Sequence, residues 1–370
     1  MFTATHLCVK RRPIGFARSG VFYVPAFSFL CVQNSDPHFA HLRTPYRSFH
    51  TSFSFPVQRV PPSMRASYCD GYYVPLPEGH PFPMGKFPAL HRCLLDEGLL
   101  QPNGVVTPRQ ADWTDLRRVH TAEYLTHLAE GTLSARAERR MGLPWSKRLV
   151  YRSRLAVQGT INAALMALTD GVAANLAGGT HHAFPGHGEG FCVLNDVAVA
   201  IRVLQAACWV QRVLIVDLDV HQGNANAAFF ADDDSVFTFS MHGAKNYPFE
   251  KPPSSLDVPL DDETDDQAYL DTLETYLPRT LDAVQPDLVF YLGGIDVATD
   301  DRFGRMALTR AGLHARDRYV LEQIHARDLP VALLLSGGYA ETPEATADLH
   351  AIMHREAARV FGTTAAATPQ

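Results

Sequence analysis

The chain has 370 residues, 46% of them hydrophobic, which is enough to bury the core of one large domain or of two smaller ones. No apolar stretch reaches the roughly 18 to 20 residues needed to cross a bilayer, so we expect no transmembrane helix and no membrane partner. The net charge of −6 divides into +6 over residues 1–63 and −12 over the rest, and an acidic body argues against direct nucleic acid binding.

The first 63 residues are poor in acids and lack the periodicity that begins after Met64. Three interpretations stay open for them: sequence upstream of a true start at Met64, a transit-type leader to an organelle, or a disordered extension. We predict an extension over 1–63, one domain over 64–364 and a tail over 365–370. The six cysteines form no CxxC pair, which favours a reducing compartment, the cytoplasm, and leaves the oligomeric state open.

Apolar residues recur with helical spacing in five segments and form short continuous runs in four others. The predicted helices cover residues 150–169, 195–209, 265–283, 310–326 and 342–361. The predicted strands cover residues 213–216, 236–239, 288–292 and 331–335. Apolar strands that alternate with helices are typical of a sheet covered on both faces, so we predict a single-domain α/β fold around a mostly parallel sheet.

Polar or glycine-rich sequence follows each predicted strand: "DLDVHQGN", "SMHG", "GGID" and "SGGY" in chain order. The carboxyl ends of parallel strands lie on one edge of a sheet, where ligand crevices form. We therefore expect the functional residues to gather at that edge.

The first of these stretches places Asp217, Asp219 and His221 two residues apart, so that they share one side of an extended chain. Buried carboxylates are costly unless a positive charge meets them, and a divalent metal is the economical solution. A carboxylate and a histidine suit zinc, and Asp296 in "GGID" is the predicted third ligand.

Two other features fit a metal-assisted hydrolase. "GGTHHAF" places His181 and His182 in a loop, and a histidine that moves protons needs its second ring nitrogen held by an acceptor, a role open to Asp217 and Asn224. Tyr339 follows two glycines at a strand end, where a phenol can donate to an oxyanion. Each feature alone is also typical of a salt-bridged strand end or a hydrogen-bonded core histidine, so the prediction depends on their combination.

In chain order, "GGTHHAF", "GEGFCVLND", "VDLDVHQGN", "GGID" with "DRFG", and "SGGY" resemble the zinc-dependent histone deacetylase family of the arginase/deacetylase fold. The resemblance spans about residues 68–345 and also includes "HPFPMGK" and "VHTAEYL". "HPFPMGK", "EGFCVLND" and "DDRFG" are most similar to the class IV branch and its bacterial relatives. The resemblance implies a catalytic domain with an eight-stranded sheet.

The resemblance also implies a role for each site residue. Zinc, one per chain, is held by Asp219, His221 and Asp296. His182 is the general base and then the acid, His181 its electrostatic companion, and Tyr339 binds the substrate carbonyl. The remaining implied residues are Asp217, which orients His181; Asn224, a neutral orienter of His182; Gly190, Phe191 and Cys192, which line an acyl-lysine tunnel; and a possible potassium site at Asp217, Asp219, His221, Ser240 and Met241. A neutral orienter should leave His182 less basic than the aspartate of class I members does.

The implied activity is removal of acetyl or other acyl groups from the ε-amine of lysine in proteins or peptides by metal-activated water. The alternative is an acetylpolyamine or small-molecule amide deacetylase on the same scaffold, and the length of the acyl group stays open. A two-manganese ureohydrolase is disfavoured because Gly223 stands where its D-x-H-x-D motif needs the second carboxylate. A non-catalytic acyl-lysine binder would have lost part of the constellation, and every member is present.

Overall fold

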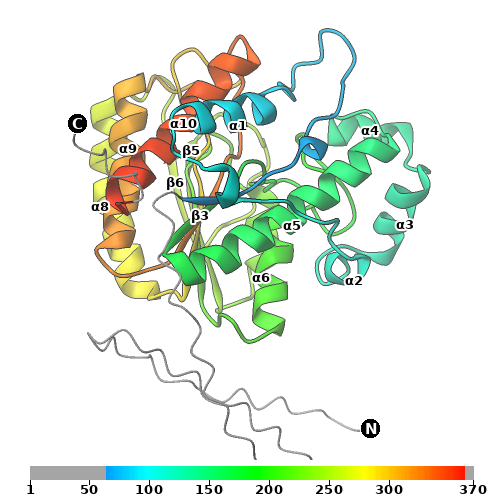
Figure 1. Cartoon of the computed structure of the whole chain (residues 1–370), viewed down its shortest axis with the longest axis horizontal. Helices are drawn as coiled ribbons and strands as arrows, with labels where there is room; N and C mark the ends of the chain where they lie inside the picture. The colour runs from blue at the N-terminus through cyan, green and yellow to red at the C-terminus, as the bar shows by residue number, and fades with distance from the viewer. Residues whose placement is uncertain (1–63, 363–370) are drawn as a thin grey trace, which may run out of the picture. The chain divides into compact units, whose positions relative to one another are not determined.

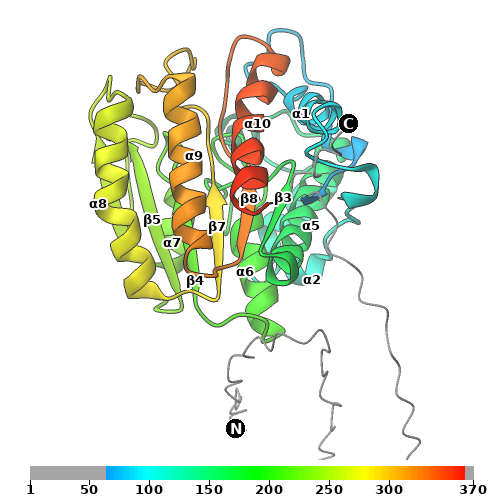
Figure 2. The same cartoon turned by 60° about the vertical axis from the view of Figure 1, so that its left-hand side comes forward.

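Eight parallel strands form one central sheet in the computed structural model, which describes residues 64–362 (Figures 1 and 2). The strand order across the sheet is β2-β1-β3-β8-β7-β4-β5-β6. The strands are β1 (Arg65–Ser67), β2 (Val105–Val106), β3 (Val172–Asn175), β4 (Val213–Asp217), β5 (Val236–Gly243), β6 (Leu256–Leu260), β7 (Leu288–Leu292) and β8 (Val331–Leu334). The predicted α/β fold is confirmed, and every strand pair within the described residues is parallel.

Helices cover both faces of the sheet, with α8, α9 and α10 together on one face in Figure 2. The helices are α1 (Lys86–Asp96), α2 (Trp113–Leu116), α3 (Ala122–Glu130), α4 (Ala135–Met141), α5 (Lys147–Asp170), α6 (Asp196–Ala206), α7 (Asn224–Phe230), α8 (Asp266–Val284), α9 (Arg310–His325) and α10 (Pro343–Val360). Short 3-10 turns occupy Asp70–Tyr72 and Pro102–Gly104.

The pleat of β4 divides the core into two layers. Leu214 and Val216 pack in the cluster that includes α8, α9 and α10, whereas Val213 and Ile215 pack in the cluster that includes α6. Alternate side chains of a strand point to opposite faces, so a strand buried on both faces is apolar throughout. This is why the sequence of β4 shows a continuous apolar run.

The five predicted helices are present with shifted ends. Two of them begin at a capping side chain: Asn195 accepts from the Ala198 N–H at 2.8 Å, and Asp265 accepts from the Ala268 N–H at 2.9 Å. The helix expected over 195–209 ends earlier, at Ala206. No helix among residues 64–362 is long and apolar enough to span a membrane.

The three neighbouring strands β8, β7 and β4 bring their polar ends together at the centre of the sheet. Backbone bonds connect the loops that follow them: the Leu218 N–H donates to Leu292 O at 3.1 Å, and the Ile295 N–H donates to Gly337 O at 3.0 Å. The residues predicted to carry chemistry are therefore held by a rigid part of the fold. The predicted extension over 1–63 and the tail over 365–370 lie outside the described residues.

Candidate metal centre and active site

Asp219, His221 and Asp296 meet at the carboxyl edge of the sheet. One ligand atom from each lies within 4.8 Å of the others, and both carboxylates are fully buried. His221 Nδ1 lies 3.0 Å from Asp219 Oδ1 and 3.1 Å from Asp296 Oδ2. The loops after β4 and β7 thus bring together three residues that the sequence places up to 77 positions apart.

The two buried carboxylates of this group favour the binding of a cation. Burial and the neighbouring Asp219 carboxylate raise the pKa of Asp296 to about 7, although His221 lies beside it. Two buried carboxylates repel each other unless a positive charge lies between them. Two oxygen ligands and one imidazole form a donor set that zinc accepts, with room for a further ligand as in catalytic sites. The residues present therefore fit a zinc ion.

Gly337, in the loop after β8, closes over the two carboxylates. Its N–H donates to Asp219 Oδ2 at 2.6 Å. A Cβ at this position would lie 1.9 Å from Asp296 Oδ2 and 2.6 Å from Asp219 Oδ2, which no packing allows. Only glycine permits this close approach, and this explains the first glycine of the "SGG" sequence after the last strand.

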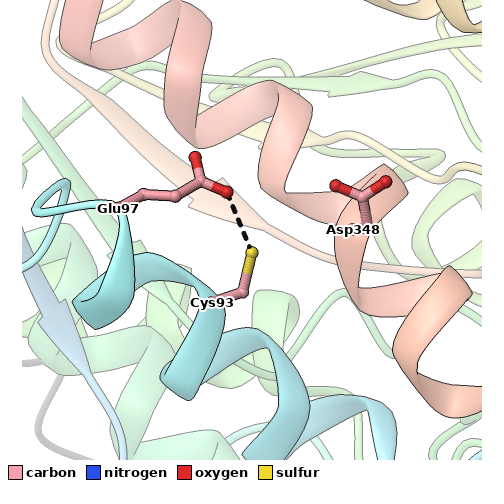
Figure 3. A group of neighbouring side chains, drawn as sticks. All are labelled: Cys93, Glu97 and Asp348. Carbon is pink, nitrogen blue, oxygen red and sulfur yellow. Dashed lines mark hydrogen bonds between the residues drawn. The ribbon is translucent and has the colours of Figure 1, made fainter.

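A second group of metal-binding residue types, Cys93, Glu97 and Asp348, lies between α1 and α10 (Figure 3). The Arg355 guanidinium already neutralises it, donating to Glu97 Oε1 at 2.6 Å and to Asp348 Oδ1 at 2.8 Å. Burial and the Glu97 carboxylate raise the pKa of the Cys93 thiol to about 11, so a thiolate ligand is disfavoured. This group is better described as a surface ion-pair cluster.

His181 and His182 lie side by side in the loop after β3, with ring centroids 4.1 Å apart. His181 Nδ1 donates to Asp217 Oδ2 at 2.7 Å, and His182 Nδ1 donates to Asn224 Oδ1 at 2.7 Å. Each histidine thus has the partner that the sequence allows, one carboxylate and one amide. Because both Nδ1 atoms are engaged, the Nε2 atoms are left for chemistry in the pocket.

The two imidazoles differ in basicity. Burial alone would lower the pKa of His181, but the Asp217 and Asp219 carboxylates raise it to about 9. Burial and the neighbouring His181 and His221 imidazoles hold the pKa of His182 well below its usual value. His182 is therefore the neutral member of the pair, as its amide partner predicts.

Asp196, at the start of α6, holds the backbone of the loop that carries His181 and His182. Its carboxylate accepts from the Gly179 N–H at 3.1 Å and from the Thr180 N–H at 2.8 Å. Gly179 adopts a φ of +81°, and a Cβ there would lie 2.8 Å from the Ser336 nitrogen of the loop after β8. Asp196 stands near the start of a predicted helix, and nothing local in the sequence shows that it will hold the histidine loop.

Tyr339 faces the same pocket from the loop after β8. Its backbone N–H donates to Asp301 Oδ2 at 2.7 Å, and its carbonyl accepts from Arg302 Nε at 2.9 Å. No residue within 64–362 hydrogen-bonds its hydroxyl. Burial and the Asp296 and Asp219 carboxylates raise the pKa of this phenol well above 10, so it stays a neutral donor.

Aromatic rings form the wall of the pocket that leads to these groups. The Phe191 centroid lies 5.4 Å from that of Phe82 and 5.9 Å from that of Tyr339. Gly190 and Cys192, the other two predicted tunnel residues, also line the pocket. A narrow aromatic passage admits an extended aliphatic chain and excludes bulky groups.

Lys86 also lines this pocket, and the sequence pattern predicted no role for it. It is almost fully buried, and Nζ donates to Ser336 O at 3.2 Å and to Gly338 O at 3.4 Å. Burial lowers its pKa to about 8 in spite of the nearby Asp296 carboxylate. The lysine ties α1 to the loop that carries Tyr339.

The sequence profile that describes the histone deacetylase domain matches residues 80–354 of the chain. The chain belongs to the histone deacetylase domain family. It is therefore a deacetylase-family amidohydrolase, and the buried Asp219, His221 and Asp296 group is consistent with the metal site typical of histone deacetylases.

Individual relatives agree with this assignment. Histone deacetylase 2 of Arabidopsis thaliana is 30% identical over 299 residues, covering 78% of this chain and 77% of that protein. An uncharacterized protein of a Picosynechococcus species is 48% identical over 294 residues, covering 80% of this chain and 98% of the relative. The crystal structure of the HDA15 HD domain superposes with a TM-score of 0.64 at 22% identity, covering 80% of this chain and 96% of that one, which shows the same fold.

Proposed function

We propose that this member of the histone deacetylase domain family is a zinc-dependent hydrolase that removes acetyl or other acyl groups from the ε-amine of lysine in proteins or peptides. One observation carries the proposal. Asp219 and His221 of the buried Asp-His-Asp group, the neutral His182 imidazole and Tyr339 all line one narrow aromatic pocket. The aliphatic stem of an acyl-lysine has the shape that such a pocket accepts.

Asp219, His221 and Asp296 would hold the zinc. When bound, the ion supplies Lewis acidity, which lowers the pKa of a water and polarises an amide carbonyl. The three ligands present two negative charges in a buried setting, so they favour a divalent cation over a neutral ligand.

His182 acts as the general base and then as the general acid. Its Nδ1 proton is committed to Asn224 Oδ1, so Nε2 carries the lone pair that takes a proton from the attacking water. The same Nε2 then returns that proton to the leaving ε-amine. His181, held against Asp217, stays beside this imidazole as its electrostatic companion.

Tyr339 stabilises the oxyanion. The hydroxyl forms no hydrogen bond within residues 64–362, so it is free to donate to the substrate carbonyl oxygen as negative charge develops there. Its backbone, fixed by Asp301 and Arg302, places the ring beside the metal ligands. Phe191, Gly190 and Cys192 would line the substrate's path.

Several finer assignments belong to the same proposal. "HPFPMGK", "EGFCVLND" and "DDRFG" support a place near the class IV branch. Asp217 and Ser240 are register partners at the ends of β4 and β5, which supports a potassium ion near these two residues together with Asp219, His221 and Met241. We also propose a cytoplasmic location and a catalytic domain over residues 64–364.

The test is acyl release by the zinc-loaded protein. We expect release from an acyl-lysine peptide, loss of activity with a chelator, recovery with zinc, and inhibition by a hydroxamate. Parallel assays with an acetyl-lysine peptide, a long-chain acyl-lysine peptide and an acetylpolyamine separate the substrate classes. Turnover of the acetylpolyamine alone would replace the lysine substrate, and no release from any of the three would refute the proposal.

A further inference from the structure

Glu189 lies just before Phe191 in the wall of the pocket, and its carboxylate is almost fully buried. Oε1 accepts from Asn224 Nδ2 at 3.1 Å and from the Tyr247 hydroxyl. Oε2 accepts from Arg140 Nε at 2.5 Å and lies 3.4 Å from His187 Nε2. Three hydrogen-bond donors from separate parts of the chain, Arg140, Asn224 and Tyr247, therefore converge on one carboxylate beside the active site.

These donors keep Glu189 ionised. Burial would raise the pKa of the carboxyl group, but the nearby His187 imidazole and the hydrogen bonds from Tyr247, Arg140 and Asn224 hold it well below its usual value. An ionised carboxylate can only accept hydrogen bonds. The end of the Asn224 amide that faces Glu189 must therefore be the NH₂ group.

The orientation of Asn224 decides the protonation pattern of His182. With Nδ2 turned toward Glu189, Oδ1 faces His182 Nδ1 at 2.7 Å and keeps the proton on that atom. The Ala225 N–H donates to the same oxygen at 3.0 Å and favours the same orientation. A flipped amide would direct its oxygen at the carboxylate and its NH₂ at the imidazole, which would draw the lone pair to Nδ1 and leave Nε2 protonated.

The loop of Glu189 also packs on the ring that it would control. A Cβ at Gly190 would lie 2.7 Å from His182 Cδ2, so the loop backbone touches the imidazole. The Tyr247 ring, which is bound to Glu189 through its hydroxyl, lies edge-on to His182 with centroids 5.2 Å apart. The carboxylate thus holds two of the groups that enclose the imidazole.

We propose that Glu189 is a positioning residue for the proposed deacylation, fixing the Asn224 amide and through it the tautomer of His182. The proposal rests on the proposed function. It also explains why a glutamate at position 189 suits an asparagine, and not an aspartate, at position 224. An aspartate at position 224 would have two equivalent oxygens and would need no orientation, and the Glu189 carboxylate would then repel it.

This pairing makes the test a double-mutant cycle. In the wild-type background, we expect Glu189→Leu to lower kcat by roughly 10- to 100-fold, as loss of such a supporting group commonly does, with little change in KM. We expect Glu189→Gln to lower kcat less, because it keeps one acceptor oxygen. In the Asn224→Asp background the sign should reverse, with Glu189→Gln raising kcat because it removes a carboxylate beside another carboxylate.

A matched control separates positioning from general packing. Arg140→Gln removes a donor to Oε2 and leaves the Asn224 contact intact, and Arg140 is half exposed. We expect a smaller loss of kcat than in Glu189→Leu, because Tyr247 and Asn224 still hold the carboxylate. Equal losses of kcat for Glu189→Gln in both backgrounds would overturn the proposal, since packing alone predicts no sign reversal.

A second measurement does not depend on turnover. The side-chain NH₂ resonances of Asn224, identified by their absence in Asn224→Asp, should exchange slowly with solvent in the zinc-loaded wild type and at least about tenfold faster in Glu189→Leu. Unchanged exchange would refute the role of Glu189. A wild type inactive on every acyl substrate would refute the proposed function instead, while this exchange rate would still decide whether Glu189 fixes the amide.

Discussion

Replacing Tyr339 by phenylalanine removes one hydroxyl group from the site and keeps the aromatic ring. The ring keeps its place because the backbone bonds to Asp301 and Arg302 do not involve the side chain. No residue within 64–362 loses a hydrogen bond, so folding and zinc binding should be unchanged. Removal of one oxyanion donor typically costs about 2.7 to 4 kcal/mol of transition-state stabilisation, which corresponds to roughly 100- to 1,000-fold in kcat.

The assay compares kcat, KM and zinc content of Tyr339→Phe with wild type on an acyl-lysine peptide. Tyr276→Phe, an exposed site on α8, is the matched control and should behave as wild type. We expect kcat to fall within the stated range while KM and zinc content stay near their wild-type values. Full turnover in Tyr339→Phe would remove this residue from the mechanism, and lost zinc would show that it supports the ligands instead.

Two further substitutions test the geometry and the electrostatics. Gly337→Ala should lower zinc affinity by roughly tenfold or more, because a Cβ there collides with both carboxylates. The control Gly186→Ala should not change it, because a Cβ at that position meets open space. Competition with a chelator measures zinc affinity, and equal affinities of the two variants would refute the close packing. Hydrogen bonds from Arg310 and Arg355 lower the pKa of Asp348 to about 2, so its contribution to stability is present above the unfolded pKa of about 3.9 and is lost as pH falls toward 2. Asp348→Asn should therefore be less stable than wild type at pH 7, with a difference that narrows in urea unfolding below about pH 4, and a constant difference would contradict this ion-pair account.

The central strands and the residues at their ends could be predicted from the sequence because each apolar run is followed directly by a polar or glycine-rich stretch. β4, β7 and β8 are apolar on both faces, and each is followed at once by polar or glycine-rich sequence. The metal ligands and the tyrosine lie in those stretches. Strand order then places them together, so a local pattern was sufficient to predict a site assembled from distant segments.

The strands β1, β2, β3 and β6 were not predicted, for physical reasons. β3 has only four residues, two of them alanine. β1 and β2 have three and two residues, too few to show a pattern. β6 carries Pro259, which removes a backbone donor and is tolerated only because this strand lies at the edge of the sheet. Strands as short as β1 and β2 depend on their neighbours rather than on their own sequence.

The supporting residues of the site were missed because their partners are far away in the chain. Lys86 contacts Ser336, 250 residues later, and Glu189 contacts Tyr247, 58 residues later. Both lie in sequence stretches that resemble the family, yet a lysine or a glutamate has no local feature that shows which group it will meet. Only the fold shows that Lys86 bonds the loop after β8 and that Glu189 accepts a hydrogen bond from Asn224.

Metal content is the most direct test of the central claim that Asp219, His221 and Asp296 share one zinc ion. The measurement is zinc per chain after equilibrium dialysis, for wild type and for Asp219→Asn, His221→Ala and Asp296→Asn. Our account predicts one zinc per wild-type chain and a large loss of zinc in each of the three variants. Two manganese ions per wild-type chain, or zinc retained in all three variants, would contradict it.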